Sequence, residues 1–178
     1  MEQLVGDGFL LRRANAADVD FLVALATHAD VEPFLAAVSA RDREELAADI
    51  ARSEAEPSHY GRFVVDVAGE TAGAHAFEVS NRRSRIANLF GVMFHPDFRG
   101  RGIADGATGL LVRHLLFELG YHRLQLECYG FNERAMRHFE RVGFVREGVK
   151  RRAYWRRDEW VDGVFYGLTQ EDLEKREA

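Results

Sequence analysis

Apolar residues recur along the chain with the two spacings that strands and helices impose. Runs that are apolar at every position or at every second position predict seven strands. They lie at residues 8–13, 63–67, 71–79, 86–94, 123–129, 145–152 and 161–168. Wider apolar spacing predicts four helices, at residues 15–31, 39–53, 103–119 and 132–142. This order predicts an α/β fold, with a mixed, mostly antiparallel central sheet of about seven strands and helices on both faces.

Single residues set several of these boundaries. We expect the first helix to begin at Asn15 and to end before the Glu32-Pro33 pair. Ser39 is placed to cap the second helix, which is acidic. Residues 86–94 are apolar at nearly every position, which is expected of a strand covered on both faces.

Composition narrows the class of protein. No stretch of about 18 apolar residues predicts a membrane span, and the first residues lack the basic and apolar segments of a signal peptide. Cys128 is the only cysteine, which excludes an internal disulfide and favours a reducing compartment. No repeat or linker rich in proline interrupts the chain. We therefore expect one cytoplasmic domain over residues 1–178.

Charged residues are unevenly distributed along the chain. Residues 1–80 carry 6 basic and 15 acidic side chains, a net charge of −9. Residues 81–178 carry 18 basic and 14 acidic ones, a net charge of +4. Two differently solvated surfaces would explain this pattern. It would equally fit a cationic partner near the first half and an anionic ligand near the second.

A glycine-rich segment follows the strand at residues 86–94, and its chemistry suits a phosphate. Gly100 and Gly102 let the backbone approach a ligand closely, and the next helix begins with unpaired N–H groups that attract an anion. Arg99 and Arg101 add full positive charges. The segment lacks the patterns of dinucleotide and nucleoside-triphosphate loops. Glycines that serve only helix–strand packing are the alternative.

Motifs in sequence order resemble those of the GNAT acetyltransferase superfamily. Residues 99–104, Arg-Gly-Arg-Gly-Ile-Ala, resemble its Arg/Gln-x-x-Gly-x-Gly/Ala signature. The segments 124–128, 132–135 and 139–144 (L-x-L-x-C, N-x-x-A and F-E-x-x-G-F) are similar to its second conserved block. Residues 147–168 resemble the branch that contains ribosomal-protein alanine N-acetyltransferases. The resemblance covers essentially the whole chain and implies a GNAT fold.

The resemblance also implies how acetyl-coenzyme A binds as co-substrate. In the family, the strand before the loop diverges from its neighbour and pairs with the pantetheine arm, a task that falls here to Val92, Met93 and Phe94. Asn132 matches a residue that contacts the cofactor or fixes this divergence, and it would equally serve as a plain helix cap. Phe139 stands where many members carry a tyrosine. The pyrophosphate is expected on N–H groups of Arg99, Gly100, Arg101, Gly102, Ile103 and Ala104.

Acyl transfer needs a neutral amine, a donor for the developing oxyanion and a proton for the departing thiolate. The family's usual tyrosine and glutamate are replaced by Phe139 and Asn88, so the motifs assign no catalytic residue. Glu78 and Glu127 are candidate bases, each against the alternative of a solvated carboxylate on a strand. Tyr129 is a candidate acid, against the alternative of a packed aromatic. Proximity of the two substrates would supply much of the rate in any case.

Basic and aromatic residues alternate between Lys150 and Trp160. Nucleic-acid binding is one interpretation, but a wall of the acceptor site or a contact in a homodimer fits an acidic chain of net charge −5 better. The histidines and the single cysteine show no metal-ligand spacing, so we expect no metal. His95 and His138 lie near the loop and are interpreted as surface histidines.

The expected function is transfer of the acetyl group of acetyl-coenzyme A to a primary amine, above all a protein N-terminal amine. A small polyamine or aminoglycoside is the first alternative acceptor, because the acidic first half would attract it. A coenzyme A-binding regulatory module without turnover is the second, in view of Phe139 and Asn88.

Overall fold

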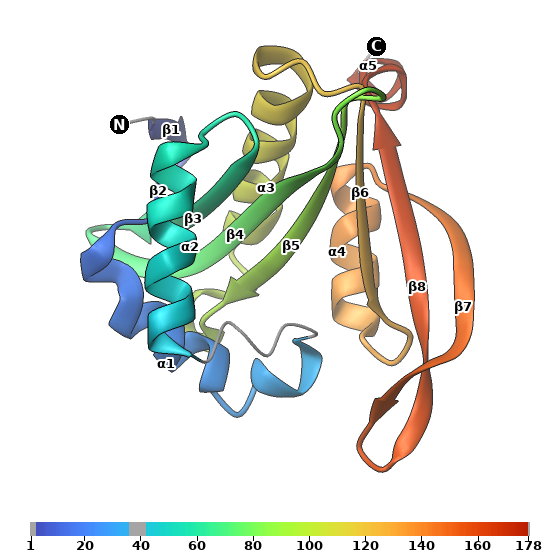
Figure 1. The fold of residues 1–178 in the computed structure, drawn as a ribbon, viewed down its shortest axis with the longest axis horizontal. Coiled ribbons are helices and arrows are strands. Elements are labelled where there is room, and N and C mark those ends of the chain that lie inside the picture. The colour runs from blue at the N-terminus through green and yellow to red at the C-terminus, as the bar shows by residue number, and fades with distance from the viewer. Residues whose placement is uncertain (1–2, 36–41, 178) are drawn as a thin grey trace.

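The computed structural model describes residues 3–35 and 42–177, which form one sheet of eight strands with helices around it (Figure 1). The strands are β1 (Gln3–Gly6), β2 (Phe9–Arg13), β3 (Tyr60–Val67), β4 (Glu70–Asn81), β5 (Ile86–Phe94), β6 (Arg123–Tyr129), β7 (Val145–Arg156) and β8 (Glu159–Thr169). The helices are α1 (Val19–Thr27), α2 (Arg43–Ala55), α3 (Ile103–Arg113), α4 (Glu133–Val142) and α5 (Gln170–Glu177).

The strands lie in the order β1-β2-β3-β4-β5-β6-β8-β7. Neighbours are antiparallel except β5 and β6, which are parallel. The predicted mixed, mostly antiparallel α/β sheet is therefore confirmed. The strand beyond the predicted seven is β1, a short, half-exposed edge strand that pairs with β2.

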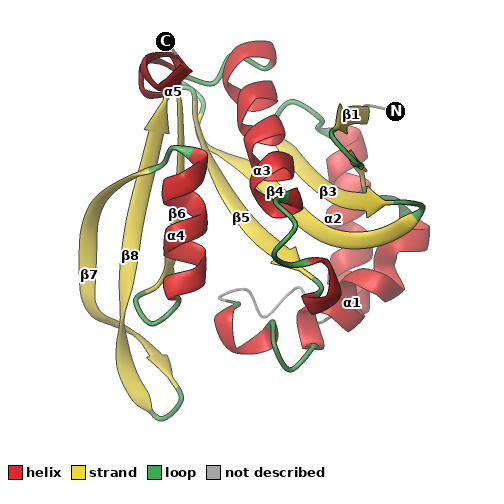
Figure 2. Ribbon diagram, turned by 180° about the vertical axis from the view of Figure 1, so that it is seen from behind, coloured by secondary structure: helices red, strands yellow, loops and turns green. Residues whose placement is uncertain are grey.

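Helices cover both faces of the sheet but not its whole width. In Figure 1, α1 and α2 lie in front of β2, β3 and β4, whereas α3 and α4 lie behind the sheet, as Figure 2 shows. Side chains along β3 point alternately to the two faces of the sheet and contribute to a hydrophobic core on each face. Phe63 and Val65 belong to the rear core, and Val64 between them belongs to the front core with Leu46 and Ile50 of α2. The front of β6, β8 and β7 carries no described helix (Figure 1).

β5 and β6 pair only through the first three residues of each strand and then diverge (Figure 1). On its other side β5 stays paired with β4, but Gly91 and Val92 form a bulge opposite the single residue His75. Gly91 has a φ of +60°, a left-handed conformation that glycine adopts without strain. A bulge bends its strand. Among the described residues, the later part of β5 therefore has no strand partner on the side of β6.

The first helix ends earlier than the sequence pattern predicts. α1 stops at Thr27, and the Glu32-Pro33 pair forms a separate 3-10 turn with Phe34. The intervening residues 28–30 offer the core no large apolar side chain. Without such packing, local hydrogen bonds alone stabilise a short helix too little to extend it.

Other boundaries also differ from expectation. Asp42 caps α2 through two backbone N–H groups of its first turn, while Ser39, the predicted cap, lies outside the described residues. The predicted helix at 103–119 is α3 followed by a π-helical turn, His114–Glu118. The carboxyl-terminal helix α5 is not predicted, because its mostly polar residues have little apolar period.

Strand β5 has the predicted bounds, but the expectation that both of its faces are covered is wrong. Ala87 and Leu89 are buried in the rear core, whereas Asn88 and Phe90 on the opposite face are only half-buried. The helices α1 and α2 lie in front of β2 to β4, and Phe90 therefore faces a hollow.

Candidate active site

Two hollows open where β5 and β6 diverge. The rear hollow, about 230 Å³, lies between the end of β5, the start of α3 and one face of α4. The front hollow, about 160 Å³, is lined mainly by β5, β6 and Tyr154 of β7. Described residues that line both are Phe34, Leu35, Val92, Met93, Asn132, Ala135 and Phe139. The hollows thus share a wall, across which molecules bound in each would meet.

The rear hollow begins at the loop between β5 and α3. Gly100 and Gly102 both have a φ of +75°, and a Cβ built on either would meet no atom within 4 Å. Other residues rarely adopt this conformation, so the backbone here requires glycine. No described side chain caps the amino terminus of α3. Its first N–H groups are therefore available to an anion.

Among the described residues, three arginines line the rear hollow: Arg99 from the loop and Arg134 and Arg141 from α4. The Nε of Arg99 donates to the carbonyl of Phe94 at 3.2 Å, which holds its side chain beside β5. Burial and the nearby charge of Arg134 lower the pKa of Arg99. An anion bound between these two cations would relieve their repulsion.

The predicted set omits Arg134 and Arg141, although the sequence contains a signal for both. A helix that begins after Asn132 brings positions 134, 138 and 141 to one face, because they are four and three residues apart. The predicted helix and the basic residues at this spacing together indicate a cationic wall.

A chain of polar side chains runs from the rear hollow into the core. Arg141 donates to both oxygens of Asp105, with Nε 2.6 Å from Oδ2. Asp105 Oδ1 also lies 2.6 Å from His138 Nδ1. Thr108 Oγ1 lies 3.1 Å from His138 Nε2 and 2.7 Å from His75 Nε2. The chain thus links the surface of the hollow to a buried histidine of β4.

Both histidines of this chain are buried and neutral at pH 7. His138 is 8% exposed, which overturns its interpretation as a surface histidine. Burial lowers the pKa of His138, and it lowers the pKa of His75 to about 3. His75 Nδ1 has no hydrogen-bond partner among the described residues. Hydrogen bonds therefore fix this wall. They join the two neutral imidazole rings, through Thr108, to the Asp105 carboxylate, whose negative charge is balanced by Arg141.

Most residues predicted to bind the cofactor line the rear hollow, namely Val92, Met93, Phe94, Arg99, Gly100, Ala104, Asn132 and Phe139. The other three do not line it: Arg101 lies over the ring of Phe98, Ile103 is buried in the rear core, and Gly102 precedes α3. Asn132 accepts from the N–H of Ala135 at 3.1 Å. Its role as a helix cap is confirmed, and a contact with the cofactor stays a prediction.

Glu127 lies in the front hollow with a partner on each carboxylate oxygen. The hydroxyl of Tyr154 donates to Oε1 at 2.6 Å, and the Nζ of Lys150 lies 2.5 Å from Oε2. Both partners come from β7, on the far side of β8. These contacts cross over β8, and Gly163 of β8 leaves room for them, because a Cβ there would lie 2.1 Å from Oε1 of Glu127. The hydrogen bonds to Glu127 raise the pKa of Tyr154 and of Lys150, so both keep their protons.

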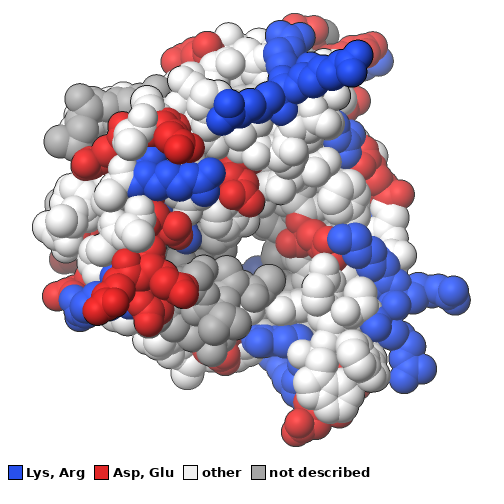
Figure 3. Space-filling model, viewed as in Figure 1, with Lys and Arg blue, Asp and Glu red and all other residues white. Residues whose placement is uncertain are grey.

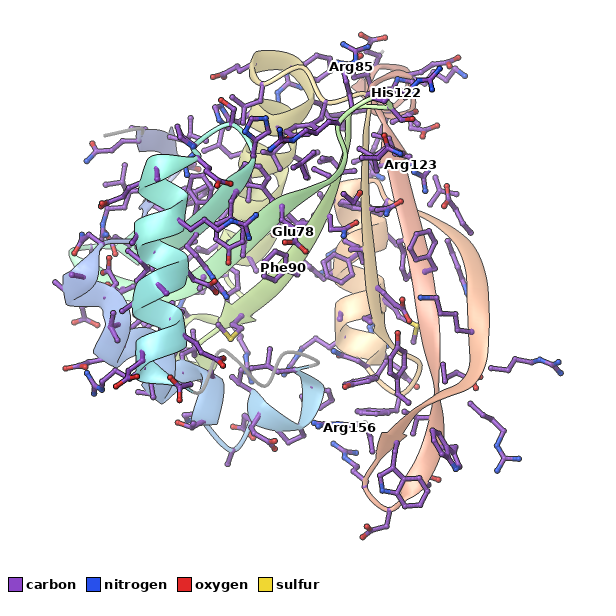
Figure 4. The ribbon with its side chains drawn as sticks, viewed as in Figure 1. Glu78, Arg85, Phe90, His122, Arg123 and Arg156 are labelled. Atoms are coloured by element: carbon purple, nitrogen blue, oxygen red, sulfur yellow. The ribbon has the colours of Figure 1, made fainter. Side chains whose placement is uncertain are left out.

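Glu78, the other candidate base, is not among the described residues that line either hollow. It lies on β4 opposite Asn88, is 42% exposed, and is 3.8 Å from Arg52 of α2. Figure 4 places it beside Phe90 on the front of the sheet. Both bases remain predictions, and of the two only Glu127 lines the front hollow.

Tyr129 lines the front hollow but is packed between aromatic rings. Its ring stacks on Phe131 with centroids 5.3 Å apart and meets Tyr154 edge-on at 5.6 Å. The guanidinium of Arg156 lies 5.3 Å from its centroid. This packing agrees with the interpretation of Tyr129 as a structural aromatic, and its role as an acid stays a prediction.

Cys128 also lines the front hollow, where it would be the obvious residue to carry an acyl group. Burial and the negative charge of Glu127 raise the pKa of its thiol to about 12. The thiolate is the nucleophilic form of cysteine. Cys128 is therefore a poor nucleophile at neutral pH.

The β7–β8 hairpin closes one end of the front hollow. Arg156 reaches from β7 to the carbonyls of Glu32 and Pro33, at 3.4 and 3.3 Å (Figure 4). Trp155 and Trp160 form the neighbouring cross-strand pair of the hairpin and are more than half exposed. The hairpin thus lines the hollow, as one of its interpretations expects, and a homodimer contact stays a prediction.

Charge is divided across the face that contains the front hollow. Figure 3 shows acidic side chains gathered over α1 and α2 and basic ones along the β7–β8 hairpin, with the hollowed centre between them. The uneven charge of the sequence therefore becomes two oppositely charged sides of one opening.

The chain belongs to the acetyltransferase (GNAT) domain family, whose model matches residues 9–145. It is similar to the SPbeta prophage-derived uncharacterized N-acetyltransferase YokL of Bacillus subtilis, with 29% identity over 94 residues, 53% of this chain and 52% of YokL. It is also similar to spermidine N(1)-acetyltransferase of Escherichia coli K12, with 32% identity over 87 residues, 49% of this chain and 46% of that protein. The chain spans about half the length of these curated relatives.

The fold is shared with ribosomal-protein-S5-alanine acetyltransferase of Vibrio fischeri. The TM-score is 0.82, at 14% identity, over 97% of this chain and 98% of that chain. The identity is low, so this likeness concerns the fold alone. The predicted GNAT fold is thereby confirmed.

The structure bears on two further expectations. Within residues 3–35 and 42–177, no helix combines the length and apolar character that a membrane span requires. In the same ranges, no three histidine, cysteine, aspartate or glutamate residues group closely enough to bind a metal ion.

Proposed function

We propose that this protein is an N-acetyltransferase that transfers the acetyl group of acetyl-coenzyme A directly to a primary amine. The observation that carries the proposal is the wall shared by the two hollows. A donor in the rear hollow and an amine in the front hollow would meet beside Val92 and Met93. Cys128 is too poor a nucleophile to act as an intermediate carrier, which favours direct transfer.

The rear hollow fits acetyl-coenzyme A, which supplies the acetyl group as an activated thioester. Its phosphates match the N–H groups at the start of α3 and the guanidinium groups of Arg99 and Arg134. On the side of β6, backbone groups of β5 after Asn88 lack a strand partner among the described residues. They are therefore free to bind the amides of the pantetheine arm as an added strand would.

Glu127 is our candidate general base. An acceptor amine arrives largely as an ammonium, since the reference pKa is about 10.4 for lysine and about 7.7 for a protein N-terminus. Glu127 would accept a proton from it, directly or through a water. Tyr154 and Lys150 orient the two carboxylate oxygens.

Stabilisation of the leaving group requires less of this protein. Phe139 has no proton to donate where many GNAT enzymes carry a tyrosine. A thiol has a reference pKa near 8.5, so a thiolate can depart without an acid. An unpaired N–H of β5 near Val92 would donate to the thioester oxygen as its negative charge grows.

A protein N-terminal amine is the acceptor that we favour. The front of β6, β8 and β7 is free of described helices, so an extended peptide would fit along it to present its amine to Glu127.

A polyamine is the second candidate acceptor. Residues 1–80 carry a net charge of −9, and their acidic side chains border one side of the front opening (Figure 3). Such a field concentrates cations. The similarity to spermidine N(1)-acetyltransferase favours the same class.

Thiol release from acetyl-coenzyme A, measured with a panel of amines, tests the proposal. We expect release with peptides that carry a free amino terminus and none with the same peptides after N-acetylation. Spermidine and an aminoglycoside test the second candidate, and the KM of a polycation should rise with salt because the Debye length is only about 10 Å at 0.1 M. If coenzyme A binds but no amine releases thiol, the protein is a regulatory module without turnover.

A further inference from the structure

The chain contains two lysines, Lys150 and Lys175, and each is paired with a glutamate. Lys175 pairs with Glu171 at 2.7 Å along the surface of α5, where both side chains are more than 70% exposed. Lys150 pairs with Glu127 at 2.5 Å, and Glu127 lines the front hollow. The same kind of ion pair thus occurs once on an outer helix and once at the candidate active site.

The path of the Lys150 side chain is unusual for a surface lysine. Lys150 lies on β7 opposite Gly163 of β8, and Glu127 lies on β6, on the other side of β8. The side chain therefore crosses a whole strand, with Nζ 5.8 Å from the ring centroid of Phe165. The absence of a Cβ at Gly163 leaves room for Glu127 beside that strand. The crossing brings a primary ammonium of the protein to the carboxylate that faces the hollow.

We propose that Lys150 is a self-acetylation site, whose ammonium occupies the position on Glu127 that the acceptor ammonium takes during turnover. This inference rests on the proposed function. Lysine presents the same reactive group as the proposed acceptors, a primary amine. The side chain of Lys150 is 55% exposed, and its ammonium contacts a carboxylate that lines the hollow. Tyr154 holds the other carboxylate oxygen.

The step is balanced without any further reagent. Glu127 takes one proton from the ammonium of Lys150, and the freed lone pair forms a bond between Nζ and the acetyl carbon. The bond from that carbon to sulfur breaks, and its electron pair leaves with the sulfur. Nζ then loses a second proton, and the thiolate takes up one proton. The products are acetyl-lysine, coenzyme A with a free thiol, and one proton released to solvent.

The test uses the full chain incubated with acetyl-coenzyme A and no amine, followed by mass spectrometry. Trypsin does not cut after acetyl-lysine, so modification yields a peptide that spans residues 147–151. We expect acetylation at Lys150 on the order of 100-fold faster than at Lys175, the size of effect that a positioned base provides. Its rate constant should not depend on protein concentration, and Lys150→Arg should abolish it while Lys175→Arg leaves it unchanged. Glu127→Gln should slow the acetylation of Lys150 on the order of 100-fold. The amide oxygen of the new glutamine can still accept the hydrogen bond of Tyr154.

Two results would overturn the inference. Equal acetylation of both lysines, or an unchanged rate in protein unfolded by urea, would show simple chemical acetylation of exposed amines. An unmodified Lys150 in protein that acetylates the amine panel would reject self-acetylation and leave the proposed function intact. Failure of both reactions would instead reject the proposed function, and the inference with it.

Discussion

The rear and front hollows share a wall, yet a loop and helices complete the lining of the first, whereas strands supply most of the second. The rear hollow takes most of its lining from continuous stretches of chain: the end of β5, the loop before α3 and one face of α4. The front hollow combines Arg62, Phe90, Glu127 and Tyr154, which come from four different strands. We therefore expect binding in the rear hollow to depend on backbone N–H groups and on glycine conformation, and chemistry in the front hollow to depend on side chains that meet across the sheet.

The two hollows also treat their acidic groups differently. In the rear hollow, Asp105 is held by Arg141 and His138, and its pKa is lowered by these partners. In the front hollow, Glu127 is held by a phenol and by an ammonium whose side chain is half exposed. The first arrangement fixes a binding wall, and the second leaves a carboxylate that an incoming amine can reach. We therefore expect changes in the rear hollow to affect cofactor affinity and changes in the front hollow to affect proton transfer.

The largest effect should come from removing the candidate base. Glu127→Gln should lower kcat/KM for the amine by about 10²–10⁴-fold, the range for general base catalysis. Affinity for coenzyme A, measured by calorimetry, should stay the same because Glu127 lies outside the rear hollow. The wild-type rise of kcat/KM with pH should also disappear.

Glu78→Gln is the matched control for this prediction, since it makes the same change on the same face of the sheet. It should keep both the rate and the pH profile of the wild type. A loss of the pH-dependent rise in Glu78→Gln, with Glu127→Gln unaffected, would assign the base to Glu78 instead.

The next largest effect should come from the loop of the rear hollow. Gly102→Val should weaken coenzyme A binding on the order of 100-fold, or about 2.7 kcal/mol. A branched side chain cannot adopt a φ of +75° without strain, and it would displace the N–H groups that begin α3. Calorimetric titration of the folded variant with coenzyme A measures the loss.

Gly120→Val separates this loss from a general loss of stability. Gly120 has a φ of +72° and the same open surroundings, but it is not part of either hollow as described. The two variants should lose similar stability, and Gly120→Val should keep the affinity for coenzyme A. Equal affinity in both variants would remove the loop from the binding site.

Stability should depend on pH through the polar chain behind the rear hollow. Burial lowers the pKa of His75 from 6.5 to about 3, so the unfolded chain binds more protons between these values. The free energy of unfolding should be fully retained above pH 6.5 and fall as the pH drops toward 3, by as much as about 1.4 kcal/mol per pH unit. His75→Gln should flatten this slope in urea titrations between pH 6.5 and 4.5. A variant slope as steep as that of the wild type would show that other groups control it.

The smallest effect should come from a single cation of the rear wall. Arg134→Gln should raise the Kd for coenzyme A up to about fivefold, the size expected for one partly exposed ionic contact, and should reduce its salt dependence. Arg137→Gln is the control on the same helix, because Arg137 is exposed and pairs with Glu133. Equal effects of the two variants would mean that only the general charge of α4 matters.

The comparison also explains which parts of the site are predictable from sequence. The bounds of β5 and β6, the glycine loop and the start of α3 follow from local features, namely apolar spacing and the conformational needs of glycine. Most residues predicted to bind the cofactor lie in β5, in the glycine loop or at the start of α3, and eight of the eleven line the rear hollow, including Asn132 and Phe139 of the α4 region. Arg134 and Arg141 could have joined them, since helical spacing alone places them on one face.

The sequence by itself thus determined the order of the elements between β2 and β8 and the position of the glycine-rich loop, because each depends on residues close together in the chain. Only the tertiary structure decided where β5 leaves β6, that His138 is buried, and that Lys150 reaches Glu127 across Gly163. These features depend on strand order, on register and on a bulge. Pairing energies between distant segments fix the strand order, the register and the bulge. A shift of the strand register by one residue would turn each side chain of that strand to the other face of the sheet. A local apolar pattern therefore predicts that Glu127 lies on a strand, and the fold alone determines what it meets there.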